Sequence, residues 1–193
     1  MSAGLDRERT LLVREAYSAA ARDPDGQHPF AVGRELALGV GYPAGLLDRL
    51  PEPAVAAFAG VSAVCVTATL HPGDRVLDLG CGAGLDSLVA AERVRPGGAV
   101  IGVDFSADML ARAASAGGGE VGWCRASADR LPLAAASVDV ALVNGIFNLN
   151  PARSWIFAEL ARVVRPGGRV HAAELVLGGT LPEAERTEAN WFA

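Results

Sequence analysis

The order of apolar and polar residues along the chain predicts helices first and a sheet afterwards. From Asp6 to Arg22 the apolar residues recur at helical spacing, and the pattern ends at the breaker sequence Asp-Pro-Asp-Gly of residues 23–26. Residues 27–70 continue as short apolar pieces that prolines interrupt, without the alternation typical of strands. We therefore expect residues 1–70 to form a helical cap that begins with one amphipathic helix.

The pattern changes at residue 71, after which apolar runs of strand length alternate with stretches of helical length. The runs lie at 75–79, 99–103, 121–125, 138–143 and 169–176, and the helical stretches at about 85–95, 107–116 and 152–165. This alternation predicts an α/β fold over residues 71–193, with a Rossmann-like parallel sheet and helices on both faces. Arg-Pro-Gly-Gly follows the first and third helical stretches, and we expect the same helix-to-strand connection at both places.

Composition and charge exclude several classes of function. The 193 residues, 51% of them hydrophobic, suffice for one substantial core. No apolar run reaches the roughly 20 residues of a membrane span, and the first residues lack the order of a secretory signal, so we expect a cytoplasmic protein without a membrane partner. The net charge of -5 offers no general attraction for nucleic acid. The three cysteines are far apart, so we expect neither a disulfide framework nor a bound metal.

The segment "VLDLGCGAGLDS", residues 76–87, joins the first strand to a helix through three glycines at alternate positions. Gly80, Gly82 and Gly84 lack the Cβ atoms that keep a ligand away from the backbone, and they tolerate positive φ. Such a turn at the carboxyl end of a parallel strand suits a dinucleotide phosphate or the sugar and amino acid of S-adenosylmethionine. The third glycine comes only two residues after the second, whereas the dinucleotide fingerprint has a spacing of three.

An acidic residue, Asp78, precedes the first glycine by two positions. The complete segment "DLGCGAG" resembles the first motif of the class I S-adenosylmethionine-dependent methyltransferases. Strands four and five also follow in the order of that fold, and the resemblance covers about residues 72–177. It implies S-adenosylmethionine as the cofactor. It also implies that the sixth and seventh strands typical of the group are absent from this chain.

The resemblance implies roles for residues that follow the next strands. Asp104 ends the second strand, where a carboxylate accepts both ribose hydroxyls, and its alternative role is a helix N-cap. Asp129 corresponds to the acid that binds the adenine amino group, and its alternative is an isolated surface residue. The implied cofactor-binding set is Asp78, Gly80, Gly82, Gly84, Asp104, Phe105, Met109, Ala128, Asp129 and Asn144, whose apolar members either wall the adenine or belong to the core.

Longer segments resemble the arsenite methyltransferase group, among them "GYPAGLLDRLP", "VIGVDFSADML", "ADRLPLAAASVDVALVNGIFNLNP" and "VVRPGGRV". In that group thiolates hold arsenic, and the corresponding positions here are occupied by Val61 and Gly145. Near the N-terminal helix, where the group often has a cysteine pair, this chain has "GQHPF". Because arsenic(III) requires two or three convergent soft ligands, we expect a small-molecule acceptor other than arsenite.

Methyl transfer from a sulfonium is an in-line displacement with an activated leaving group, so the protein mainly aligns the acceptor and excludes water. We expect Gly145, Phe147 and Asn148 to contact the acceptor, although Asn148 is also a common turn former. The residues expected to take part in catalysis are His28, Asn144 and Glu174. His28 lies in a segment that closes over the site in the resembling group, where an imidazole is a suitable base; its alternative is a surface-loop histidine.

Two other functions stay open on the sequence. One is an NAD-linked oxidoreductase that uses the same crevice, which the glycine spacing disfavours. The other is a pseudoenzyme or scaffold module that binds the cofactor or nothing. An open sheet edge would favour this module, and pairing of that edge in a homodimer is one way to cover it.

Overall fold

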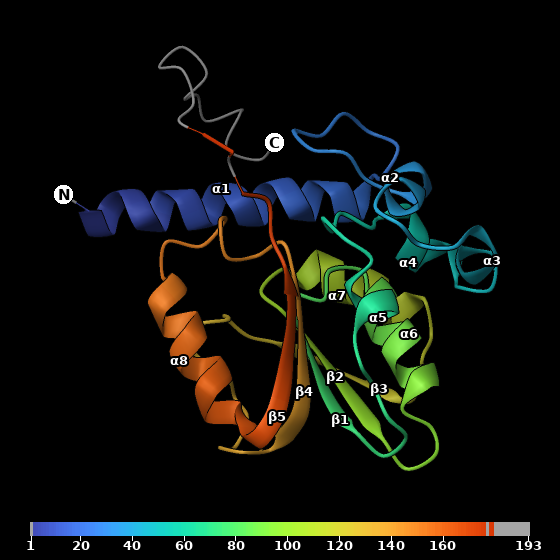
Figure 1. Cartoon of the computed structure of the whole chain (residues 1–193). Helices are drawn as coiled ribbons and strands as arrows, with labels where there is room; N and C mark the ends of the chain where they lie inside the picture. Colours follow the sequence, from blue (N-terminus) through green and yellow to red (C-terminus); the bar gives the residue numbers. More distant parts are fainter. Residues whose placement is uncertain (1, 177, 180–193) are drawn as a thin grey trace.

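The computed structural model describes residues 2–176, 178 and 179, which form an α/β structure built on one parallel sheet (Figure 1). The strand order is β3-β2-β1-β4-β5, with β1 (Arg75–Leu79), β2 (Ala99–Asp104), β3 (Val121–Arg125), β4 (Val138–Asn144) and β5 (Val164–Ala173). The helices are α1 (Ser2–Arg22), α2 (Arg34–Gly39), α3 (Ala44–Leu47), α4 (Glu52–Ala56), α5 (Val64–Thr67), α6 (Leu85–Arg93), α7 (Ala107–Ser115) and α8 (Arg153–Val163). The expected Rossmann-like sheet, with its helices and its N-terminal helical segment, is confirmed.

Each face of the sheet carries its own hydrophobic core, because successive side chains of a strand point to opposite faces. Val76, Val140 and Leu142 pack with α6 and with the short cap helices on one face. Leu77 and Val143 pack with α8 on the other face. The central strands β1 and β4 are therefore buried along almost their whole length, which is typical of parallel sheets covered on both sides.

The second Arg-Pro-Gly-Gly sequence does not form the expected connection. Residues 96–98 form a turn between α6 and β2, but β5 begins at Val164, directly after α8, and includes residues 166–168. Val138 pairs with Val164 and Val140 with Arg169, so the extra residues form a bulge in β5. The expected strand 169–176 therefore starts too late and ends beyond Ala173. Gly168 packs tightly in this bulge, since a Cβ there would lie 2.7 Å from the Asp139 carbonyl oxygen.

The long helix α1 crosses above the carboxyl ends of the strands (Figure 1) and is fastened to α7 at its C-terminal end. Arg22 pairs with Asp108 at 2.8 Å. Arg112 of α7 donates hydrogen bonds to the carbonyl oxygens of Ala21 and Pro53, so one side chain joins α1, the cap and the sheet helices. The position of α1 over the sheet is thus fixed by side chains far away in the sequence.

A buried carboxylate joins the cap to the sheet. Asp86, in the first turn of α6, accepts hydrogen bonds from the Tyr42 hydroxyl, from the Cys65 amide at 3.0 Å and from the Asn144 side chain at 2.9 Å. Asn144, at the end of β4, also accepts from the Val61 amide at 2.9 Å. These contacts connect the cap segments around Tyr42, Val61 and Cys65 with the start of α6 and the end of β4.

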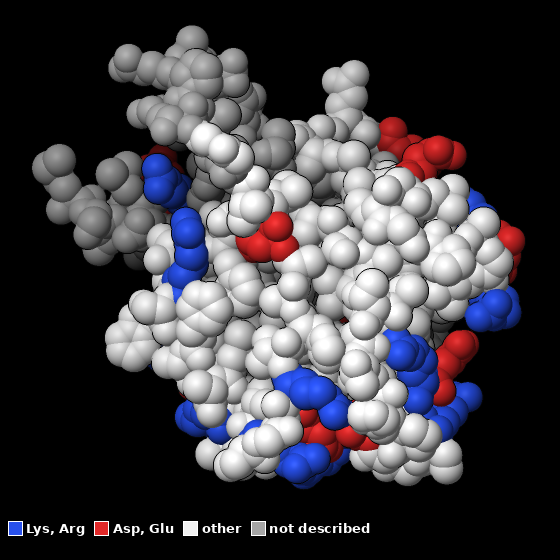
Figure 2. Space-filling view, viewed as in Figure 1, with Lys and Arg blue, Asp and Glu red and all other residues white. Residues whose placement is uncertain are grey.

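Ion pairs gather at the end of the sheet opposite α1, where basic and acidic side chains lie together at the bottom of Figure 2. Asp139 of β4 accepts hydrogen bonds from the Arg75 amide and side chain and from the Arg165 side chain. Burial alone would raise the pKa of Asp139, but these hydrogen bonds outweigh it and hold the pKa at about 2. This carboxylate therefore favours the folded state at neutral pH.

None of the helices described here is long and apolar enough to cross a bilayer. Strand β5 forms one edge of the described sheet, and the homodimer expected from the sequence stays a prediction. The segment "LPEAERTEANWFA", which begins like a helix, lies outside the described residues.

We predict that Asp139→Asn lowers the free energy of unfolding by about 1–2 kcal/mol at pH 7, allowing for screening at the half-exposed arginines. The folded-state pKa lies below the usual value, so this stabilisation is present above about pH 4 and is lost as the pH falls through about 2. Urea denaturation of both proteins between pH 7 and pH 3 measures the difference. Asp25→Asn, at an exposed turn, is the control; a difference that does not shrink on acidification would contradict the prediction.

We predict that Tyr42→Phe destabilises the protein by about 1–2 kcal/mol, because Asp86 loses a hydroxyl donor in a buried site. The ring keeps its edge contact with Phe58, so packing is conserved. Thermal and urea denaturation give the measurement, with Ser115→Ala, which removes an exposed hydroxyl, as control. Equal stability of the Tyr42 variant and the wild type would show that the hydroxyl does not support the cap.

Candidate functional site

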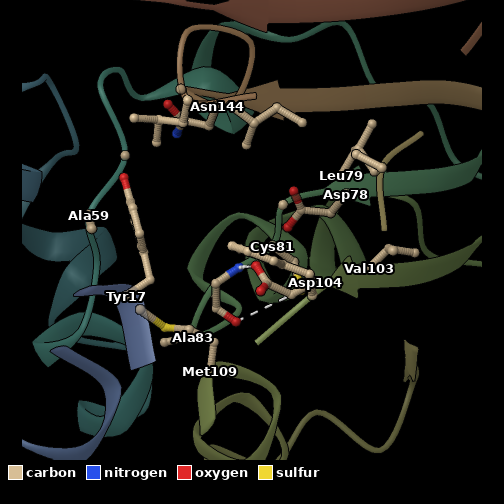
Figure 3. Close-up of a pocket in the computed structure, with 18 of the residues that line it drawn as sticks. Tyr17, Ala59, Asp78, Leu79, Cys81, Ala83, Val103, Asp104, Met109 and Asn144 are labelled. Atoms are coloured by element: carbon tan, nitrogen blue, oxygen red, sulfur yellow. Dashed lines mark hydrogen bonds between the residues drawn. The ribbon is translucent and has the colours of Figure 1, made fainter. Parts of the chain in front are cut away.

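A pocket opens at the carboxyl ends of β1, β2 and β4, beneath α1 (Figure 3). Its floor is the glycine turn after β1, and one wall is built by the end of β2 and the loop after β3. The opposite wall is built by the loop after β4 and by residues 57–60 of the cap. This is the crevice in which doubly wound folds bind their ligands.

The three glycines of the turn differ in what they make possible. All have positive φ, +75° at Gly80, +52° at Gly82 and +88° at Gly84. A Cβ on Gly80 would overlap Ile146, and one on Gly84 would lie 2.5 Å from the ring of Trp123. A Cβ on Gly82 would meet nothing closer than 3.9 Å, so this glycine faces open space. Gly82 therefore leaves room beside the backbone, whereas Gly80 and Gly84 permit close packing of the turn.

Asp104 points toward the glycine turn and closes it. Its buried carboxylate accepts a hydrogen bond from the Gly82 amide at 2.9 Å and another from the Ser106 amide at 2.8 Å. The N-cap of α7 is Ser106, whose hydroxyl accepts from the Met109 amide at 3.2 Å, so the alternative role of Asp104 as N-cap is wrong. Burial raises the pKa of Asp104, and the amide hydrogen bonds partly oppose this effect.

Two further buried carboxylates line the pocket. Asp78 accepts a hydrogen bond of 2.5 Å from the Ser87 hydroxyl. Burial raises the pKa of Asp78, and the negative charge of Asp86 raises it further. The pKa of Asp86 is also raised by burial, against the hydrogen bonds from Tyr42 and other donors. In Figure 3, Asp78 and Asp104 lie on one side of the pocket and Tyr17 on the other.

The residues expected around the adenine are only partly brought together. Phe105, Met109 and Ala128 line the pocket, together with Ser127. Asp129 is not among the residues that line it, within the part of the chain that the structure describes. Its carboxylate accepts a hydrogen bond from the Ser127 hydroxyl. The role of Asp129 in binding adenine stays a prediction.

On the acceptor side, Asn144 and Gly145 line the pocket as expected, and Ile146, Leu149 and Asn150 do so as well. The amide group of Asn144 is fully engaged, since it also bonds the Ser62 amide and carbonyl at 3.2 and 2.8 Å. Asn144 therefore holds the cap loop in place at the pocket. Its catalytic role stays a prediction.

Phe147, Asn148 and Glu174 lie behind the pocket wall. Phe147 is buried and stacks on Phe157, with ring centroids 4.7 Å apart. The Glu174 carboxylate accepts hydrogen bonds from the amides of Phe147 and Asn148 at 2.7 and 3.1 Å. These residues thus fix the loop after β4, and none of the three lines the pocket itself.

His28 lies outside the pocket lining, in the loop between α1 and α2. Its Nε2 is 2.7 Å from the carbonyl oxygen of Asp23, and its ring lies near that of Phe30. This geometry agrees with the alternative of a loop histidine. A role as general base stays a prediction that would need the loop to move.

Sequence reasoning missed the residues that close the pocket from above. Thr10, Val13 and Tyr17 of α1 line it, and Tyr17 stacks on Phe30 at a centroid distance of 4.4 Å. Burial raises the pKa of Tyr17, as do the charges of Asp104 and Glu174, so its hydroxyl is protonated at neutral pH. The spacing of 10, 13 and 17 did mark one face of the helix. It did not say what that face would cover.

Two positions that the arsenite methyltransferase resemblance singled out are neighbours. A Cβ on Gly145 would lie 3.0 Å from Val61 Cγ1, at the cap side of the pocket. Cys65 and Cys81 are buried, and burial raises the pKa of both thiols. Among residues with described placement, no group of three or more histidine, cysteine or acidic side chains has a metal-binding arrangement.

Comparison with known proteins agrees with this geometry. Residues 76–168 match the model of the family described as "Methyltransferase domain". Over 120 residues the chain is 39% identical to the arsenite methyltransferase of Halobacterium salinarum, a match that covers 60% of this chain and 31% of the relative. Over 104 residues it is 38% identical to the nocamycin O-methyltransferase of Saccharothrix syringae, covering 52% and 37%.

Among solved structures, the chain is similar to an arsenic(III) S-adenosylmethionine methyltransferase from Chlamydomonas reinhardtii, with a TM-score of 0.62 and 26% identity. That match covers 84% of this chain and 58% of the other. The chain thus spans about a third of the length of the two curated relatives. These matches show a methyltransferase domain over residues 76–168, and together with the glycine turn and its carboxylates they show that the chain resembles the class I S-adenosylmethionine-dependent methyltransferases and their arsenite methyltransferase branch.

Proposed function

We propose that the protein binds S-adenosylmethionine in the pocket beneath α1 and methylates a small molecule other than arsenite. The observation that carries the proposal is the meeting of the Gly82 amide and the Asp104 carboxylate at 2.9 Å on the pocket floor. Beside this contact, the missing Cβ of Gly82 leaves open space for a ligand. A cradle of this kind fits an adenosyl group.

The residues around the cradle suit the parts of the cofactor. Each Asp104 oxygen accepts one amide hydrogen bond and keeps lone pairs for the ribose hydroxyls. Phe105, Met109 and Ala128 offer an apolar wall for the adenine. Asp78 lines the pocket beside the glycine turn, where its carboxyl group would face the amino acid part. Helix α1 covers these groups and excludes water from them.

When bound, S-adenosylmethionine supplies a methyl group on a positively charged sulfur, so the leaving group needs no protonation. The chain's own residues then have to orient the acceptor and exclude water from the site. Asn144 and Glu174 hold the loops on either side of Gly145 through hydrogen bonds. Gly145 lines the acceptor wall, and its missing side chain lets Val61 of the cap pack against it.

The positions of Val61 and Gly145 support an acceptor other than arsenite. The two positions adjoin, as two thiolate ligands would have to, and neither residue has a soft donor atom. Cys65 is buried, and its amide is bonded to Asp86. A relative of 38% identity is named as an O-methyltransferase, which supports an organic acceptor.

We predict that S-adenosylhomocysteine binds the wild type and that Asp104→Asn weakens binding about 10- to 100-fold, the effect of losing a hydrogen bond to a charged group. Isothermal titration calorimetry measures both affinities, with circular dichroism to confirm that the variant is folded. Asp25→Asn, on an exposed turn away from the pocket, is the matched control.

Absence of binding to the wild type, or equal affinity of the Asp104 variant, would contradict the proposed cofactor site. The same titration with NAD⁺ tests the oxidoreductase alternative, for which NAD⁺ has to bind more tightly than S-adenosylhomocysteine. A cofactor-binding protein that transfers no methyl group to any acceptor would support the pseudoenzyme alternative.

We also predict that the folded protein retains no arsenite after gel filtration at micromolar arsenite, because no pair of thiolates converges at the acceptor wall. Mass spectrometry of the protein fraction for arsenic gives the measurement. Protein unfolded in guanidinium, in which all three cysteines are accessible, is the positive control for thiol binding. One arsenic per folded chain would overturn the exclusion of arsenite.

A further inference from the structure

Among the described residues, the pocket wall has acidic side chains and no basic ones. Asp78, Asp86 and Asp104 line the pocket, with exposed fractions of 1%, 6% and 7%. Within the described residues, no lysine, arginine or histidine lines it. A binding site for phosphate or carboxylate groups normally contains such a cation, most often arginine.

The three carboxylates are hydrogen-bonded only to neutral donors in the described structure. Asp78 accepts from a serine hydroxyl, Asp104 from two backbone amides, and Asp86 from a phenol, an amide and an asparagine side chain. None of them takes part in an ion pair among the described residues. Their charge is therefore left to be balanced by a ligand or by protonation.

Two arginines on the helices around the pocket, Arg93 and Arg112, are engaged elsewhere. Arg93 donates to the carbonyl oxygens of Cys65 and Ala68, behind the site. Arg112 donates to the carbonyl oxygens of Ala21 and Pro53. Neither guanidinium lines the pocket, and moving either one into it would break contacts that hold the cap.

The acceptor side of the pocket is mostly apolar. Val13, Phe58, Ile146 and Leu149 line it, and the polar members near them are the uncharged Thr10 and Asn150. Burial raises the pKa of Asp78, Asp86 and Asp104, so that a bound cation would be favoured by restoring their charge. S-adenosylmethionine itself, with its sulfonium and ammonium groups, carries a net positive charge that suits this wall.

We infer that the methyl acceptor is an uncharged or cationic molecule with an apolar body, and that carboxylate and phosphate compounds are rejected. The inference rests on the proposed function, because it assumes that the pocket holds cofactor and acceptor together. An anion would enter a buried site beside three carboxyl groups, whose ionisation it would oppose, and no basic side chain lines the described pocket to pair with it. An alcohol, a phenol or an amine meets no such repulsion.

Three probes with one carbon skeleton test the inference: 3-phenylpropanol, 3-phenylpropylamine and 3-phenylpropanoate. Each is titrated into protein saturated with S-adenosylhomocysteine, and ligand-observed NMR gives the dissociation constant. We expect the alcohol and the amine to bind at least about tenfold more tightly than the carboxylate, the effect of one uncompensated like-charge interaction.

A variant with a new cation makes the charge effect explicit. Leu149 is half-buried and lines the pocket, so Leu149→Lys places an ammonium at the acceptor wall. We expect this variant to bind the carboxylate probe about tenfold more tightly than the wild type does. Val66→Lys, at an exposed position on α5, has the same change of net charge outside the pocket and is the control. An equal gain in both variants would overturn the inference, because the effect would then not be local.

The outcomes separate the two proposals. Binding of S-adenosylhomocysteine with the carboxylate bound as tightly as the alcohol, or with none of the probes bound, overturns the inference on the acceptor and leaves the proposed cofactor site standing. Failure of S-adenosylhomocysteine to bind overturns the proposed function and this inference with it.

Discussion

The hydrogen bond from the Gly82 amide to the Asp104 carboxylate is the contact on which the site depends. It joins the turn after β1 to the end of β2, two neighbouring strands that finish at the same edge of the sheet. The contact requires a backbone at positive φ, and it requires a carboxylate that remains buried. Glycine meets the first requirement without strain, whereas a buried carboxylate is costly to folding, which is typical of groups kept for binding.

A second set of contacts brings the cap to this edge. Asp86 and Asn144 each bond to cap segments, so the loop around Val61 is held against the end of β4. Arg112 and Arg22 fasten the end of α1 in the same region. The cap is therefore the roof of the pocket as well as part of the shared hydrophobic core. A change in the polar contacts of the cap would alter both stability and the shape of the site.

Three buried acidic side chains line the pocket, and no basic side chain of the described residues lines it with them. Neutral donors satisfy their hydrogen bonds but not their charge, and burial raises their pKa values. A cationic ligand would lower these pKa values and stabilise the charged form of the carboxyl groups. In the proposed function, this one arrangement of acidic side chains would favour a sulfonium cofactor and disfavour an anionic acceptor.

The sequence by itself determined the alternation of strands and helices, the glycine turn and the carboxylates beside it, because these features depend on local spacing and on the common edge of parallel strands. It placed Asp78, Gly82 and Asp104 near one another for that reason. Only the tertiary structure decided that α1 covers the pocket, that Glu174 and Phe147 lie behind its wall, and that the second Arg-Pro-Gly-Gly sequence forms a bulge in β5. These outcomes depend on packing between segments far apart in the chain. Hydrophobic periodicity shows which face of a helix is buried, but the element that covers that face is chosen by contacts across the whole molecule.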